Sequence, residues 1–160
     1  MLFRSMFNHG INILGLWMVI DIIERQTVSK KISELSGVAL KAPVLTIAFV
    51  IIAFANIALP LTNAFPGEFM MFAGIFQFKK WLAVCAGFSI ILAAVYMLNL
   101  IRKVFLGTEN GTVASMTDIS LREKCMLFVL IAIIFVTGVY PQSILNITKS
   151  AVASVLNVTI

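Results

Sequence analysis

The sequence predicts an all-α protein, a polytopic membrane helix bundle of about four spans in which the second helix is discontinuous, broken by proline. Three observations support this prediction. Hydrophobic residues make up 61% of the 160 residues, whereas soluble domains are about 45–50% apolar. Long apolar runs recur, with short polar segments between them. One of these runs contains, within residues 55–69, two prolines, two asparagines and a carboxylate.

The apolar runs are placed and sized like membrane spans, since a helix crosses the bilayer core in about 20 residues. The predicted spans cover residues 5–23, 43–58 together with 66–76, 81–104, and 121–139. Prolines open both halves of the second span, where the first helical turn tolerates them. Asp21 and Arg25 are spaced to pair where the first span ends. Residues 143–158 read as a weak amphipathic tail, and residues 1–160 as a single membrane domain.

Loop charges predict the orientation of the spans. The net charge is +5, which we attribute to membrane-flanking loops and not to nucleic-acid binding. The first and third loops carry eight basic residues: Arg25, Lys30, Lys31, Lys41, Arg102, Lys103, Arg122 and Lys124. The opposite side carries four: Arg4, Lys79, Lys80 and Lys149. By the positive-inside rule, the eight face the cytoplasm and both termini face outward.

The interrupted second span is the candidate functional site. Pro60 removes a backbone donor within the run, and every backbone group freed in lipid must find a partner inside the protein. Glu68 follows in the first turn of the second half-helix, where the helix dipole favours an anion. With His9, it forms a candidate proton pathway. The supporting polar and break residues are Asn8, Asn12, Asn56, Pro60, Asn63, Gly67 and Tyr96, with Ser89 on the same face as Tyr96.

The same residues allow plainer interpretations. Residues 55–69 could be a surface loop between two short helices, with Glu68 in solvent. His9 could be bonded to a neighbouring helix for packing alone. Asn8 and Asn12 fall on one helix face, where amides join neighbouring helices without any transport role.

Several kinds of chemistry are absent from the sequence. There is one histidine, and Cys85 and Cys125 have no CxxC spacing, so we predict no metal site and read both cysteines as small reduced residues. No glycine-rich phosphate loop or nucleophile motif is present. We therefore expect no catalytic residues and no cofactor on this chain.

Five groups of residues, in order along the whole chain, resemble one known family. They are His9-Gly10, Glu24-Arg25, the stretch from Ala55 to Phe69 with Gly67-Glu68-Phe69, Tyr96-Met97-Leu98 with Arg102, Phe105 and Gly107, and Ser120-Leu121-Arg122-Glu123 with Gly138-Val139-Tyr140-Pro141. They are similar to the C-terminal third of the antiporter-like subunit M (chain 4) of the proton-pumping NADH:quinone oxidoreductase, respiratory complex I. The sequence Gly-Glu-Phe after the break is the most specific part, and Gly-x-Tyr-Pro favours subunit M over its sister subunits.

The resemblance implies that the four spans correspond to the last four of a fourteen-helix subunit that helps to move protons while NADH reduces quinone. The chain would then be a fragment of that subunit, or one part of a split subunit whose earlier helices come from a separate chain. It implies that Glu68 is the exit-side proton residue of a discontinuous helix and that His9 is a polar residue on the central axis. The implied partners are the other membrane subunits of complex I and the lipid bilayer. NADH, flavin, iron–sulfur clusters and quinone would be bound by other subunits. The implied location is the bacterial inner (plasma) membrane, or the inner membrane of mitochondria.

The chain departs from the family in two ways. The family usually has glycine where this chain has Ala58, Leu61 and Ala64, and it lacks Pro66. The carboxylate and lysines of the family's earlier helices are not among these 160 residues. Two other functions stay open: a subunit of a multi-subunit sodium/proton antiporter, and a structural fragment without transport.

Overall fold

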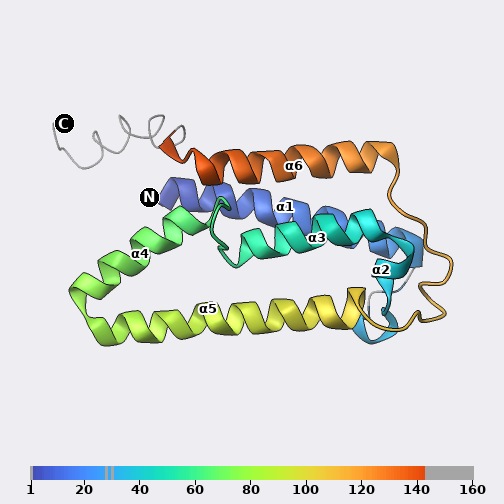
Figure 1. The fold of residues 1–160 in the computed structure, drawn as a ribbon, viewed down its shortest axis with the longest axis horizontal. Helices are drawn as coiled ribbons and strands as arrows, with labels where there is room; N and C mark the ends of the chain where they lie inside the picture. Colours follow the sequence, from blue (N-terminus) through green and yellow to red (C-terminus); the bar gives the residue numbers. More distant parts are fainter. Residues whose placement is uncertain (1, 28, 30, 143–160) are drawn as a thin grey trace.

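The computed structural model describes residues 2–27, 29 and 31–142, and these residues form an all-helical protein (Figure 1). No strand occurs among them, so the predicted all-α class is confirmed. The elements are α1 (Leu2–Thr27), the 3₁₀ turn η1 (Ile32–Glu34), α2 (Val38–Lys41), α3 (Pro43–Asn56), α4 (Phe65–Phe78), α5 (Lys80–Leu100), the π-helical turn η2 (Ile101–Phe105) and α6 (Leu121–Val139). The predicted tail at 143–158 lies outside the described residues.

Two of the described helical segments are long and apolar enough to cross a membrane: Ser5–Thr27 and Lys80–Phe105. Both are longer than the spans predicted at 5–23 and 81–104. The first extends past Ile23 because Thr27 donates its hydroxyl to the Ile23 carbonyl (2.8 Å) and Arg25 pairs with Asp21 (3.0 Å). That ion pair confirms the predicted one. Helices α3 and α4 have 14 residues each, about 21 Å apiece.

Helices α1, α3 and α6 lie side by side and form the core of the molecule (Figure 1). Along α3, apolar residues recur every three or four positions, which puts them on one helix face. The buried residues of this face include Leu45, Ala48, Phe49 and Ile52. They pack with buried residues of α1 and α6 in one hydrophobic cluster.

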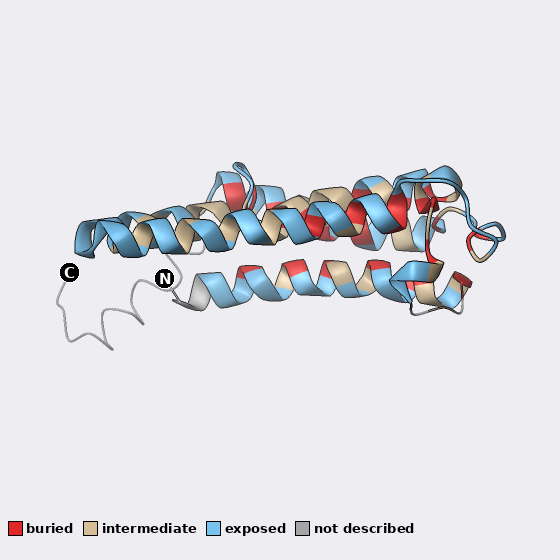
Figure 2. Cartoon of the chain, turned by 90° about the horizontal axis from the view of Figure 1, so that it is seen from below, coloured by how far each residue is buried: buried red, intermediate tan, exposed pale blue. Residues whose placement is uncertain are grey.

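The α4–α5 hairpin stands apart from this core for most of its length. No residue of α4 is buried, and Met97 is the only buried residue of α5, so pale blue and tan predominate in Figure 2 outside the core. The hairpin rejoins the core at η2, where the Phe105 ring stacks on Phe49 with centroids 4.3 Å apart. Its large exposed apolar side chains, such as Trp81 and Phe88, are suited to lipid or to other helices.

The first and third loops pack against each other at one end of the molecule. Lys41 pairs with Glu109 (3.0 Å), and the Asn110 side-chain amide donates to the Glu34 carbonyl (3.2 Å). The first loop contains η1 and α2, in and beside which Leu35 and Val38 bury their side chains. The two loops that carry most of the basic residues therefore share one end, while the α4–α5 turn lies at the other (Figure 1).

Helix α3 ends at Asn56, two residues earlier than predicted. The Leu59 N–H bonds the Phe54 carbonyl (3.1 Å), and the Ala58 N–H bonds the Ala55 carbonyl (3.2 Å). With Ala58 in the left-handed region (φ 54°), these bonds form a Schellman motif, which ends a helix. Pro60 follows it and has no N–H with which to continue the helical pattern.

The non-helical segment, residues 57–64, is covered by α6 at Gly138. A Cβ on Gly138 would collide with the Leu61 carbonyl oxygen and would lie 2.6 Å from the Thr62 carbonyl carbon. Only glycine lets the backbone of α6 approach this closely. Gly138 therefore fixes how α6 sits on the break.

We predict that Gly138→Ala lowers the free energy of unfolding by about 1–3 kcal/mol, since the added methyl overpacks a backbone contact. The measurement is thermal unfolding of the purified protein in detergent. The matched control is Gly87→Ala in α5, where a Cβ meets nothing within 4 Å and alanine is the better helix former. Equal stability of the Gly138→Ala variant and the wild type would contradict the contact.

Candidate functional site

Three asparagines from two distant segments meet at the break. Asn8 and Asn12 of α1 are 2% and 1% exposed, and Asn63 is fully buried. The Asn8 amide donates to the Asn63 carbonyl (2.7 Å), and the Asn63 amide donates back to the Asn8 carbonyl (3.3 Å). The predicted polar face of the first span thus points into the bundle and holds the break.

The second contact adds a donor at the end of the interrupted helix. The Asn12 amide donates to the Ala55 carbonyl (3.2 Å), which lies in the last turn of α3. The same carbonyl accepts the Ala58 N–H of the Schellman motif, so the Asn12 amide is a second donor to it, and in a membrane such groups must be satisfied by the protein. Helix α1 therefore supplies donors on both sides of the Schellman motif.

The side-chain oxygens of the same three amides are buried acceptors. The Oδ1 atoms of Asn8, Asn12 and Asn63 have no hydrogen-bond partner among the described residues. Buried polar atoms almost always find a donor, frequently an internal water. The cluster is therefore able to accept hydrogen bonds from water beside the break.

Glu68 lies in the first turn of α4, as predicted. Its backbone N–H bonds the Ala64 carbonyl (3.2 Å), and Pro66 occupies the tolerated start of the helix. The side chain is partly buried. Its carboxylate makes no hydrogen bond or ion pair within the described ranges. A Cβ on Gly67 would meet nothing within 4 Å, so packing within this chain does not explain that glycine.

The structure does not gather all the predicted site residues. His9, Ser89 and Tyr96 are exposed, although they were expected inside the bundle. His9 follows Asn8 directly and therefore lies about 100° round the helix from it. Tyr96 and Ser89 lie on α5, which stands apart from α1 and α3. Asn56 is partly buried at the end of α3.

Two residues of the site were not identified from the sequence as such. Thr62 is buried and donates its hydroxyl to the Leu59 carbonyl (2.6 Å), which closes the turn around Pro60. Gly138 was noted only as part of Gly-Val-Tyr-Pro, and its role in the break was not foreseen. A glycine inside an apolar helical run was the sequence feature that could have indicated this close backbone contact.

Two of the three positions where the resemblance led us to expect glycine adopt left-handed backbone here. Ala58 has φ 54° and Leu61 has φ 76°, whereas Ala64 is right-handed with φ −78°. Left-handed conformations cost a non-glycine residue about 1–2 kcal/mol. The surrounding contacts, above all the asparagine bonds, must offset this cost.

No metal-binding group of three or more histidine, cysteine or acidic residues occurs in the described part of the chain. Cys85 and Cys125 are free thiols on the surface.

We predict that Asn8→Ala lowers the free energy of unfolding by about 1–3 kcal/mol, because it leaves the buried Asn63 carbonyl without its donor. Asn12→Ala acts in the same direction through the Ala55 carbonyl. His9→Ala is the control, one position along on the exposed face. Thermal unfolding in detergent measures the stability of each variant. A larger loss of stability for His9→Ala than for Asn8→Ala would contradict the prediction.

Known proteins are similar to this chain over most of its length. A family described as "NADH:quinone oxidoreductase/Mrp antiporter, TM" matches residues 1–94. NADH-quinone oxidoreductase subunit M of Rickettsia typhi is 36% identical over 95% of this chain and 31% of its own length. The subunit M of Rhodobacter capsulatus is 31% identical over 93% of this chain and 29% of its own length.

A solved structure agrees with these relatives. A chain of "Respiratory complex I from Thermus thermophilus with bound NADH" superposes with a TM-score of 0.67 at 29% identity, over 74% of this chain and 25% of that chain. The present chain thus spans about a third of the length of the curated relatives it matches. These matches confirm the predicted resemblance to subunit M. The chain is a membrane protein that belongs to the NADH:quinone oxidoreductase/Mrp antiporter transmembrane family.

Proposed function

We propose that this chain is the part of a subunit M that forms one portion of a proton channel in a proton-pumping NADH:quinone oxidoreductase. Relatives with that name match nearly the whole chain. The observation that carries the proposal is the interrupted helix: α3 and α4 are separated by a segment held by buried amides, and Glu68 follows it directly. A broken helix with a carboxylate beside the break is a common way to build an ion path.

In this proposal α3 and α4 together make one discontinuous span, and α6 makes a fourth. The bilayer core is about 30 Å thick, so neither 14-residue half could cross it alone at about 1.5 Å per residue. The α4–α5 hairpin then packs on helices outside this chain, which would enclose Glu68, His9 and Tyr96.

Glu68 takes up and releases the translocated proton. The carboxylate can alternate between charged and neutral forms, and the dipole of α4 favours the charged one. Water held by the Oδ1 atoms of Asn8, Asn12 and Asn63 carries the proton past the break, and His9 is a second titratable group on α1. Redox energy from distant subunits drives the cycle, so no redox group is needed on this chain.

The shared polar end of the first and third loops faces the cytoplasm in this proposal, because it carries most of the basic residues. The proposed location is the inner (plasma) membrane, or the inner membrane of mitochondria, with the termini on the outer side. The proposed partners are lipid and the neighbouring membrane subunits of complex I. NADH, flavin, iron–sulfur clusters and quinone belong to other subunits of the complex.

We predict that Glu68→Gln lowers proton pumping coupled to NADH oxidation, since glutamine keeps the shape of the side chain and cannot carry the proton. The measurement is pH change in vesicles that contain the assembled complex. Glu68→Asp, which keeps a carboxyl group, should retain part of the activity. Glu34→Gln is the control, because Glu34 pairs with Lys31 in the first loop (3.3 Å). Normal pumping by a fully assembled Glu68→Gln complex would overturn the proposal.

A sodium/proton antiporter subunit is the second candidate, because the matching family covers Mrp antiporters as well. The two functions predict different requirements in vesicles. A quinone oxidoreductase subunit should support proton movement only when NADH and quinone are supplied. An antiporter subunit should exchange protons for sodium without NADH. Sodium-dependent flux that does not require NADH, and that is lost in Glu68→Gln, would favour the antiporter.

The third possibility, a structural fragment without transport, predicts a different result. Its loss would prevent assembly of the membrane complex, while Glu68→Gln would leave proton flux unchanged.

A further inference from the structure

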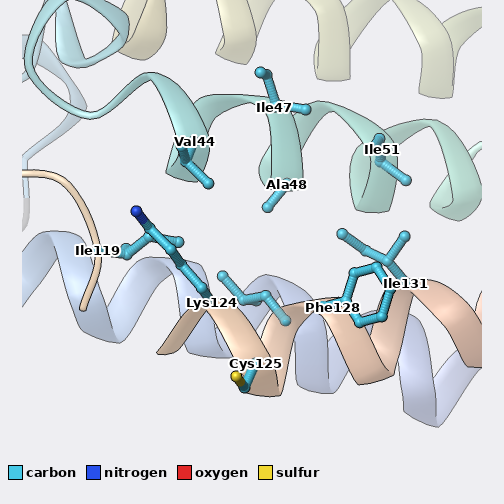
Figure 3. A pocket seen from close by; sticks show the side chains of 10 residues that line it. Val44, Ile47, Ala48, Ile51, Ile119, Lys124, Cys125, Phe128 and Ile131 are labelled. Carbon is cyan, nitrogen blue, oxygen red and sulfur yellow. The ribbon is translucent and has the colours of Figure 1, made fainter. Parts of the chain in front are cut away.

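An apolar groove runs between α3 and α6 (Figure 3). Its volume is about 500 Å³, and its walls are the side chains of Val44, Ile47, Ala48 and Ile51 on one side and of Leu127, Phe128 and Ile131 on the other. The walls extend from Val44 to Ile51 on α3, which is about 10 Å of helix. The groove is thus long and narrow and parallel to the helices.

One end of the groove carries a positive charge. Figure 3 shows the Lys124 amine beside Val44 and Ile119, at the end near the polar loops. Lys124 is partly buried, and it takes part in no ion pair within the described ranges. Its position near the N-terminal end of α6 is unfavourable for a cation, because the helix dipole is positive there.

The carboxylates around Lys124 are already engaged by other groups. Asp118 accepts hydrogen bonds from the backbone N–H groups of Val44 and Leu45 (3.3 Å each). Glu123 caps α6 through Ser120 and bonds Arg25 of α1 (3.2 Å). Neither carboxylate forms an ion pair with Lys124 within the described residues, which leaves the amine able to bind an anion from outside the chain.

We propose that this groove binds an anionic phospholipid, with one acyl chain between α3 and α6 and the phosphate on Lys124. In a bilayer the acyl chain gains little by leaving bulk lipid, because lipid tails are as apolar as leucine. The choice of lipid is therefore set by the headgroup. Basic residues beside grooves between membrane helices are suited to anionic headgroups.

The test uses the purified membrane complex that contains this chain, in nanodiscs of phosphatidylcholine. Trace phosphatidylglycerol or phosphatidylcholine is added with a photoreactive group on one acyl chain, and the labelled peptides are identified by mass spectrometry. The phosphatidylglycerol probe should label residues 43–56 and 121–139 about fivefold more than the phosphatidylcholine probe, the preference that one surface cation provides.

Variants then distinguish the effect of the Lys124 charge from the effect of the shape of the groove. Lys124→Gln should remove the preference for phosphatidylglycerol, and Lys124→Arg should keep it. Arg122→Gln, about 200° round the same helix, should leave it unchanged. Ile47→Trp should reduce labelling by both probes, because Ile47 is an exposed wall residue and tryptophan there fills the groove.

Three results would overturn the proposal. They are equal labelling by the two probes, labelling that does not depend on Lys124, and crosslinks from Cys125, beside Lys124 in the groove wall, to another polypeptide in place of lipid. Competition by inorganic phosphate as strong as competition by unlabelled phosphatidylglycerol would also overturn it, since the site would then bind an anion alone.

Discussion

The whole arrangement depends on hydrogen bonds between α1 and an interrupted helix. Ending α3 in the middle of an apolar run frees backbone carbonyls and N–H groups, and inside a membrane these cannot turn to bulk water. Asn8 supplies a donor to the Asn63 carbonyl at 2.7 Å, and Asn12 adds a second donor to the Ala55 carbonyl at 3.2 Å, beside the Ala58 N–H. Because both asparagines lie on one face of α1, the helix must present that face to the break, and this choice sets the packing of α1 on α3 and then of α6 on both.

The backbone of the break adopts unfavourable conformations, and contacts with neighbouring helices stabilise them. Ala58 and Leu61 adopt left-handed backbone without being glycine, while Gly138 lets α6 lie close to the carbonyl groups of Leu61 and Thr62. A segment of this kind persists only where neighbouring contacts over-determine it. The same contacts leave three amide oxygens facing inward, so the groups that fix the break also offer acceptors beside it. Holding the break and conducting a proton can thus share the same side chains.

The other half of the molecule is built differently. Helices α4 and α5 bury very little against α1, α3 and α6, and Glu68 begins α4 just where the chain leaves the core. The chain spans about a third of the length of its curated relatives. The apolar surface of the hairpin is suited to packing against the helices of such a longer protein. Core and hairpin meet at the polar end, where Phe105 stacks on Phe49 and Met97, Ile101 and Val104 are buried in the same core cluster. The carboxylate therefore lies on the part of the chain that other helices would have to enclose.

The sequence by itself determined the helical class, the limits of α6 at 121–139, the first-turn position of Glu68 and the ion pair of Asp21 with Arg25, because these follow from local periodicity, helix-start rules and i,i+4 spacing. Sequence also indicated one polar face on α1. Only the tertiary structure decided which amide bonds which carbonyl, that α3 ends through Ala58 ahead of Pro60, that Gly138 meets Leu61, and that His9 and Tyr96 lie on the surface. These outcomes join residues far apart in the chain, such as Asn8 and Asn63, and no local pattern encodes the register in which two distant segments pack.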